Sequence, residues 1–174
     1  MKITGRNIKR RLYGLRNIPS NIKRARYWRG HGVHSPFVYN IVRQVFMCRE
    51  LKSDDRSLYE ALSSLGIPRR RCIQLQNLLH HCNYTTFEID PKREDFSGVD
   101  MVITTIEIEP DKLAIMAEKA TQSGSTLCIM APTYDAPRHK ACEALVAQHR
   151  CTSIDNRGYL LLFNNYLPKQ IFKL

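Results

Sequence analysis

The stretch Gly30-His31-Gly32-Val33-His34-Ser35-Pro36-Phe37 divides a basic N-terminal arm from the rest of the chain. Its two glycines permit backbone angles that other residues rarely adopt, so the segment can turn tightly. Ser35 followed by Pro36 is typical of a helix start, because the serine oxygen can accept from free N–H groups and proline loses no bond at the first helical position. We therefore expect a helix to begin here.

The residues after Pro36 have the hydrophobic spacing of an amphipathic helix. Apolar side chains recur on one helical face, which is expected to be buried. They are Phe37, Val38, Ile41, Val42, Val45 and Phe46. A second helix is predicted where Ser53-Asp54-Asp55 can cap a run that Gly66 and Pro68 end. Its apolar residues are Leu58, Ala61, Leu62 and Leu65.

Positive charge is concentrated at the N-terminus. The formal net charge is +11, and residues 1–30 contain ten Lys and Arg residues and no acid. The sequence predicts a basic helical arm over residues 1–29 and a single domain over residues 30–174. Such an arm is attracted to nucleic acid or another anionic surface, or it is a solvated face of short helices that dock on the body. The residues that would meet an anionic partner are Lys9, Arg10, Arg11, Lys23, Arg24 and Arg26.

Composition argues against several classes of protein. The chain has 174 residues and 43% apolar content, enough for one real core. No apolar run approaches the roughly 20 residues of a membrane helix, and the N-terminus does not resemble a secretion signal, so a cytoplasmic location is expected. The six cysteines form no CxxC pair, and buried reduced thiols are expected. His80-His81-Cys82 lacks distant ligands, so no metal site is predicted.

From residue 72 onward, short apolar runs alternate with helical patterns. This alternation predicts an α/β fold with a mostly parallel sheet, and the closing turn 155–158 predicts an antiparallel hairpin. Helices are expected over 110–122, stopped at Gly124, and over 136–149. Strands are expected over 72–75, 84–89, 101–104, 127–130, 151–154 and 159–163.

Both ends of the chain resemble one protein family. Residues 30–37 and the following helix are similar to the N-terminal signature of a bacterial family of class I S-adenosylmethionine-dependent methyltransferases. Residues 155–163, Asp-Asn-Arg-Gly-Tyr-Leu-Leu-Leu-Phe, and 167–172, Leu-Pro-Lys-Gln-Ile-Phe, resemble its closing hairpin and its Pro-Lys-Gln tail. The resemblance implies a Rossmann-like parallel sheet that ends in a reversed hairpin, with S-adenosylmethionine as cofactor.

The middle of the chain departs from the family. There the first strand ends in an acid and a glycine-rich turn, which lets the main chain approach the cofactor. Here the place expected for that turn contains Gln74 and Gln76, and no glycine occurs between Gly66 and Gly98. The eight residues 76–83 are also too few for a parallel crossover. The chain therefore resembles a shortened, degenerate member of the family.

The resemblance nevertheless implies weak candidates for cofactor binding and catalysis. Gln74 and Gln76 stand at the expected cofactor turn, and Glu88 or Asp90 would bind ribose hydroxyls, although a surface acid ending a strand explains them too. His31 and His34 can deprotonate a substrate or simply bond backbone groups of the turn. Asp135 falls near an acidic position of the family, or it caps the helix that begins at the next residue.

The sequence leaves three alternative functions. The first is a methyltransferase-like protein whose glycine-rich cofactor loop is missing, so that activity is in doubt. Alternatively, it is a non-catalytic scaffold or partner subunit, or a module that binds nucleic acid or an anionic surface through residues 1–29. A shortened sheet also exposes an edge through which two copies can associate. The sequence names no methyl acceptor.

Overall fold

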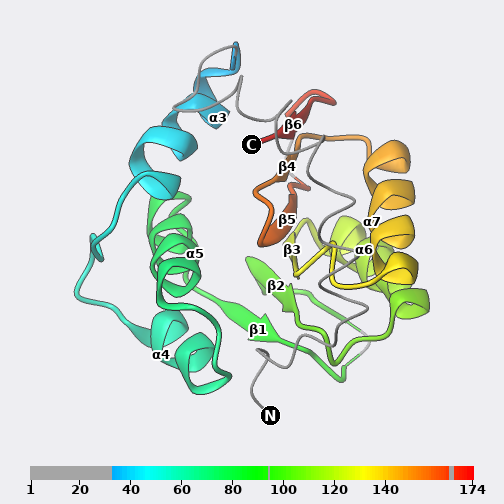
Figure 1. Cartoon of the computed structure of the whole chain (residues 1–174), viewed down its shortest axis with the longest axis horizontal. Coiled ribbons are helices and arrows are strands. Elements are labelled where there is room, and N and C mark those ends of the chain that lie inside the picture. Colours follow the sequence, from blue (N-terminus) through cyan, green and yellow to red (C-terminus); the bar gives the residue numbers. More distant parts are fainter. Residues whose placement is uncertain (1–32, 94, 165–166) are drawn as a thin grey trace. The chain divides into compact units, whose positions relative to one another are not determined.

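The computed structural model describes residues 33–93, 95–164 and 167–174. These fall into two compact units, residues 33–85 and residues 86–174 (Figure 1). The basic arm predicted over residues 1–29, and its boundary, lie outside the described residues. The domain predicted over residues 30–174 spans both units.

The unit of residues 33–85 is helical. Helix α3 (Pro36–Ile41) begins as predicted, because the Ser35 hydroxyl accepts a hydrogen bond from Val38 N at 3.4 Å. It continues as the π-helical turn η2 (Val42–Phe46), in which Met47 N–H donates to Val42 O at 3.1 Å. The predicted apolar face is confirmed as the buried one: Val38, Ile41, Val42, Val45 and Phe46 are buried, and Phe37 is half-buried.

Helix α4 (Ser57–Ser64) also follows its sequence signals. The predicted aspartate cap is confirmed only in part: the N-cap residue is Arg56, whose side chain makes no capping bond, while Asp55, one residue earlier, accepts a hydrogen bond from Ser57 N at 3.0 Å. The helix ends before Gly66, whose φ of +74° is a left-handed conformation that glycine adopts without strain. Its apolar stripe buries Leu58 and Leu62 completely.

The strand predicted over residues 72–75 is wrong, because these residues lie inside helix α5 (Arg69–His81). Every side chain from residue 72 to residue 79 is buried, three of them polar, so no helical periodicity is visible in the sequence. A short apolar run of this kind cannot be assigned to a helix or a strand by its pattern, and only the absence of a breaker over 13 residues indicates a helix. The crossover over residues 76–83, whose shortness indicated a shortened family member, therefore does not exist.

The unit of residues 86–174 contains a six-stranded sheet in the order β1-β2-β3-β5-β4-β6. Only β5 runs antiparallel to its neighbours, which confirms a mostly parallel α/β sheet with a reversed hairpin. The strand predicted over residues 101–104 is confirmed residue for residue. The tail strand β6 was not predicted. The strands are β1 (Phe87–Ile89), β2 (Met101–Thr104), β3 (Thr126–Met130), β4 (Ser153–Asp155), β5 (Tyr159–Leu162) and β6 (Ile171–Lys173).

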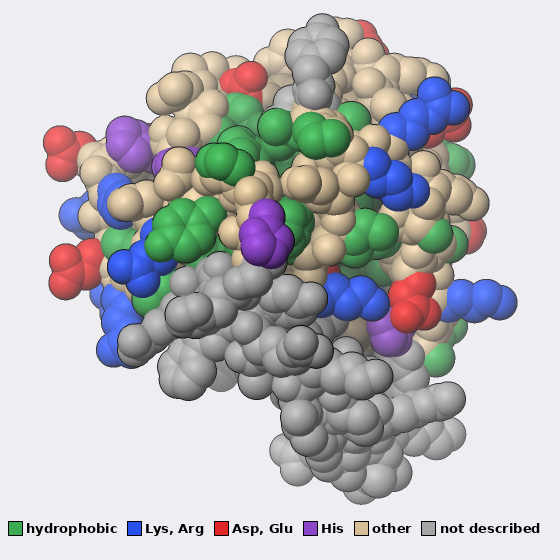
Figure 2. All heavy atoms as spheres, turned by 90° about the horizontal axis from the view of Figure 1, so that it is seen from above, with side chains coloured by type: hydrophobic (Ala, Val, Ile, Leu, Met, Phe, Trp, Pro, Cys, Tyr) green, Lys and Arg blue, Asp and Glu red, His purple; other side chains and the backbone are tan. Residues whose placement is uncertain are grey.

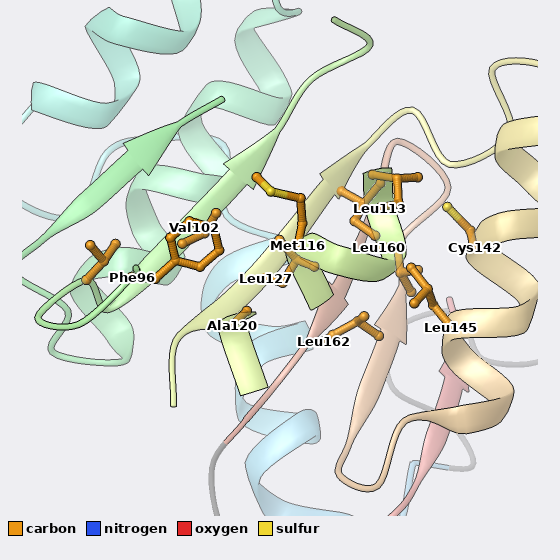
Figure 3. Close-up of a cluster of buried hydrophobic side chains, with 12 residues drawn as sticks. Phe96, Val102, Leu113, Met116, Ala120, Leu127, Cys142, Leu145, Leu160 and Leu162 are labelled. Atoms are coloured by element: carbon orange, nitrogen blue, oxygen red, sulfur yellow. The ribbon is translucent and has the colours of Figure 1, made fainter. Parts of the chain in front are cut away.

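Two helices cover one face of this sheet. The short 3-10 turn η3 (Pro110–Lys112) leads into α6 (Leu113–Ser123), which ends at Gly124 as predicted, and α7 (Ala136–Gln148) follows β3. Figure 3 shows the side chains gathered between the sheet and these helices. Burying each large apolar side chain contributes about 1.5–3 kcal/mol. The cluster includes Val102, Leu113, Met116, Ala120, Leu127, Ile129, Cys142, Leu145, Leu160 and Leu162.

The two edges of the sheet are β1 and β6. The hydrogen bonds between β6 and β4 involve every second residue of the tail, since Ser153 N donates to Gln170 O and Leu174 N donates to Asp155 O. The main chain of Ile171 therefore faces away from β4, and its side chain is 49% exposed. Self-association through such an edge stays a prediction.

Candidate functional site

Four polar residues come together where the parallel strands of the 86–174 unit end. Asp90 follows β1, Thr105 follows β2, and Asp135 and Arg138 stand at the start of α7, which follows β3. Ligands of open α/β sheets bind outside the carboxyl ends of the strands, so this edge is the candidate site.

Asp90 joins the end of β1 to the end of β2. Its carboxylate accepts hydrogen bonds from Thr105 N at 2.7 Å and from Thr105 Oγ1 at 2.5 Å. Its own N–H donates to Ile103 O at 2.8 Å. The backbone of Asp90 has a φ of +47°, a left-handed conformation that aspartate tolerates better than most residues. Each carboxylate oxygen of Asp90 therefore already has a donor from the protein.

Arg138 is the most unusual residue of the site, because its long cationic side chain is only 2% exposed. Its guanidinium donates through Nε to Met130 O at 3.2 Å, through Nη1 to Ile108 O at 2.8 Å, and through Nη2 to Thr105 O at 2.8 Å. Desolvation lowers the pKa of Arg138, while Cys142, Asp135 and Asp90 act in the opposite direction. A buried cation is tolerated when hydrogen bonds replace its water, and here main-chain carbonyls do so.

Asp135 caps helix α7, which is the structural alternative to a catalytic role that the sequence indicated. It is the N-cap of α7, and its Oδ1 accepts a hydrogen bond from Arg138 N at 2.9 Å. Pro137 lies in the first turn of the helix, as expected from its missing N–H. The cap therefore fixes the start of the helix that carries Arg138. A catalytic role for Asp135 is not required to explain its position.

Thr104, the last residue of β2, is fully buried. Among the described residues, its Oγ1 is the buried side-chain oxygen or nitrogen without a hydrogen-bond partner. It shares a face of the sheet with Val102, two residues earlier, and that face packs against α6 and α7. One hydroxyl in an otherwise apolar layer is too little to hold a polar cofactor.

The chain connections do not create a crevice at this edge. A crevice forms where neighbouring connections leave a sheet in opposite directions. Here the connection from β2 to β3 carries α6, the connection from β3 to β4 carries α7, and both helices pack on the same face (Figure 3). Within the described part of residues 86–174, there is therefore no place where the connections from neighbouring strands cross to opposite faces of the sheet.

Gln74 and Gln76, the residues predicted at the cofactor turn, do not follow a strand. Both are buried on α5, in the 33–85 unit. Gln74 donates to Phe46 O at 2.8 Å. Gln76 accepts from Tyr59 N at 2.9 Å and donates to Asp55 Oδ2 at 3.0 Å. Their amides connect α5 to the end of η2 and to the start of α4, so the reason for assigning them to a cofactor is removed.

Glu88, the other predicted ribose ligand, lies on the edge strand β1 and forms an ion pair with Arg93, whose Nε donates to Glu88 Oε2 at 2.9 Å. Asp90 is held by Thr105, as described above. A ribose-binding carboxylate needs oxygens that face an open site. The residues that the resemblance assigns to S-adenosylmethionine therefore do not fit that cofactor.

The remaining predicted residues contribute little to a site. His31 and the basic residues of the arm lie outside the described part of the chain, and His34 is exposed. No group of three His, Cys, Asp or Glu residues that could hold a metal ion occurs among the described residues. All six cysteines are free, and desolvation raises the pKa of Cys82 to about 11, so this thiol is a poor nucleophile.

Arg138 is the residue that sequence reasoning missed, although a signal for it exists. On the predicted helix 136–149, Arg138 lies on the same stripe as Cys142 and Leu145, with spacings of four and three residues. Those two side chains are buried in the cluster under the sheet. An arginine on an apolar stripe indicates either that the buried face of the helix was assigned wrongly or that the guanidinium donates to buried acceptors. The structure shows the second.

His149, the C-cap residue of α7, makes the stability of the unit depend on pH. Its Nε2 lies 2.8 Å from Phe163 O, and desolvation lowers the pKa of His149 below 6.5, a shift that this hydrogen bond opposes. The folded state therefore binds fewer protons than the unfolded state, so stability falls as the pH drops below about 6.5. We expect His149→Gln, which keeps a donor but does not titrate, to show a smaller loss between about pH 7 and pH 5. Hydrogen exchange of β5 amides measures both proteins, and equal losses would contradict this assignment.

No helix among the described residues is both long enough and apolar enough to cross a membrane.

Comparisons of the chain with protein-family models, with curated proteins and with solved structures find no match. The likeness to class I methyltransferases therefore rests on the two ends of the sequence, residues 30–37 and 155–172. What it implies for function is a proposal that must be supported from the geometry of the site.

Proposed function

We propose that this chain is a non-catalytic relative of the class I methyltransferases, which keeps a Rossmann-like sheet as a scaffold or partner subunit and does not bind S-adenosylmethionine. The two ends of the sequence support the kinship. The reversed strand β5, inserted between β3 and β4, is the arrangement that the resemblance implies for the end of the sheet.

The position of Arg138 is the observation that carries the proposal. A nucleotide-like cofactor requires main chain that is accessible at the carboxyl ends of the strands. Here the carbonyls of Thr105 and Met130, at the ends of β2 and β3, accept hydrogen bonds from the chain's own buried guanidinium. The third bond, to Ile108 O, holds the loop that follows β2 over the same side chain.

The energies involved favour the closed arrangement. Displacing Arg138 would leave the buried carbonyls of Thr105 and Met130 without donors, at about 1–3 kcal/mol each, and would also break the partly buried bond to Ile108 O. Micromolar binding of a ligand corresponds to about 8 kcal/mol in total. A cofactor that had to expel Arg138 would therefore lose a large part of its binding free energy unless its own donors replaced these hydrogen bonds.

Titration calorimetry with S-adenosylmethionine and S-adenosylhomocysteine tests the proposal. We expect no saturable heat with either compound, and no change in the amide NMR shifts of Asp90 and Thr105. Glu88→Gln is the matched variant, because it removes only an ion pair on an edge strand. Saturable binding that this variant weakens would overturn the proposal and identify a working cofactor site.

A further inference from the structure

Strand β1 presents a row of unpaired main-chain groups along its outer side. The main chains of Thr86 and Asp90 form hydrogen bonds with β2. Because alternate residues of a strand face opposite sides, Phe87 and Ile89 point their N–H and C=O groups away from β2. In the described sheet β2 is the only neighbour of β1, and no described residue bonds to these groups. The outer side of β1 can therefore accept another strand.

The order of the strands leaves β1 at an edge where a doubly wound sheet would continue. Such a sheet has two halves that extend in opposite directions from an inner strand. Here β1, β2 and β3 follow one another in a single direction, and α6 and α7 cover one face. No described strand lies on the other side of β1. The described chain therefore contains at most one half of a doubly wound sheet.

The other edge strand, β6, is protected against pairing, whereas β1 is not. Lys173 lies in β6, Pro168 and Lys169 come shortly before it, and both lysines are exposed. Lysine and proline are residues that keep edge strands from pairing. The one charged residue of β1 is Glu88, which is neutralised by an ion pair with Arg93. The edge that is suited to pairing is therefore β1.

We propose that two copies of this chain associate through β1, antiparallel and about a two-fold axis at Glu88, so that their six-stranded sheets become continuous. In this register Phe87 of each copy lies opposite Ile89 of the other, and both pairs exchange N–H···O=C hydrogen bonds. An aromatic side chain opposite a β-branched one is a favourable cross-strand pair. The two-fold axis also closes the assembly at two copies, whereas pairing β1 with β6 of another copy would continue without end.

Glu88 and Arg93 make this register electrostatically acceptable. At the axis the two Glu88 side chains would lie opposite each other, and like charges in that position are unfavourable. Each Glu88 is already bound by Arg93, through Nε to Oε2 at 2.9 Å and through Nη2 to Oε1 at 2.5 Å. The Arg93 side chain is 47% exposed, and its guanidinium has further N–H groups for the Glu88 of the other copy. Positive and negative groups can therefore alternate across the axis.

The charge of the unit that contains β1 does not oppose association. Residues 86–174 contain 10 Lys and Arg residues and 12 Asp and Glu residues, a formal charge of −2. The net charge of +11 comes from residues 1–85. Figure 2 shows Lys and Arg side chains lying among Asp and Glu side chains on the face that it presents. Two copies of the 86–174 unit therefore do not repel each other strongly.

Analytical ultracentrifugation of the full chain over a range of concentrations tests the proposal. We expect a reversible equilibrium between one and two copies. An edge strand tolerates proline where the N–H group faces outward, so Ile89→Pro should fold and raise the dissociation constant by about tenfold or more. Ile171→Pro makes the same change at the outer side of β6 and should alter the dissociation constant by less than about twofold. Hydrogen exchange of the β2 amides shows whether each variant is folded.

A second pair of variants tests the register without changing a strand, and it decides the matter if Ile89→Pro does not fold. Arg93→Glu places four carboxylates around the axis and should raise the dissociation constant by about tenfold or more. Lys92→Glu makes the same change of charge at the neighbouring exposed residue and should alter the constant by less than about twofold.

Four results would overturn the proposal. The chain could remain a single copy at every concentration, or Arg93→Glu and Lys92→Glu could have equal effects. A dimer lost in Ile171→Pro and kept in Ile89→Pro would indicate pairing through β6. Species that keep growing with concentration would indicate head-to-tail pairing of β1 with β6. This inference goes beyond the proposed scaffold, and none of these measurements involves S-adenosylmethionine, so the two proposals fail separately.

Discussion

Replacing Arg138 with alanine is expected to destabilise the 86–174 unit by about 3–5 kcal/mol, because buried carbonyl groups lose their donors at about 1–3 kcal/mol each and a large side chain is removed from a packed site. The guanidinium holds the carbonyls of Thr105, Ile108 and Met130. Alanine leaves all three acceptors without this donor, those of Thr105 and Met130 in buried positions, and also creates a cavity. Native-state hydrogen exchange of the β2 and β3 amides measures the loss in this unit directly.

Two further variants separate the causes of that loss. Arg138→Met keeps much of the volume and removes the donors, so it should remain destabilised by at least about 2 kcal/mol. Lys140→Ala changes an exposed residue of the same helix and should stay within about 0.5 kcal/mol of wild type. If Arg138→Met were as stable as wild type, the three hydrogen bonds would not be what closes the edge of the sheet.

The second half of the fold was predictable because its signals are local and agree with one another. Residues 101–103 are a continuous apolar run that continues into Thr104 and is buried on both faces, and Gly124 ends α6 where the pattern ends. The turn before Tyr159 produces the antiparallel pair of β4 and β5. In each case the hydrophobic pattern and the turn residues indicate the same element.

The error at residues 72–75 has a physical cause. Helix α5 is surrounded by other segments, and its buried polar residues Gln74, Gln76 and Asn77 bond to backbone or side-chain groups far away in the sequence. A pattern read along one segment contains no information about such partners. The same holds for Arg138, whose acceptors lie on two other segments, the loop that follows β2 and the end of β3. Of the residues predicted from the sequence, Asp90 and Asp135 lie at this edge of the sheet, whereas Gln74 and Gln76 lie on α5 and Arg138 was not predicted.

Gln76→Leu is expected to destabilise the 33–85 unit by about 1–3 kcal/mol, because it leaves the partly buried Tyr59 N–H unsatisfied, whereas the exposed Asp55 can bond to water instead. Leucine is similar in shape, but it leaves Tyr59 N–H without its acceptor and removes the donor to Asp55. Gln44→Leu, at an exposed position, is the control and should change stability by no more than about 0.5 kcal/mol. Hydrogen exchange of the α5 amides measures both variants.

The variant Gln76→Glu adds a test through pH. It keeps an acceptor for Tyr59 N–H but places a second carboxylate against Asp55, whose pKa is lowered chiefly by the hydrogen bond from Ser57 N–H. Repulsion raises the pKa of the pair in the folded state, so this variant should regain stability relative to wild type as the pH falls through the carboxyl range. A pH-independent difference would contradict the observed contact. Both Gln76 variants could instead have the stability of wild type and differ only in S-adenosylmethionine binding. In that case the Gln76 side chain would belong to a cofactor site, and other contacts would hold α5 in place.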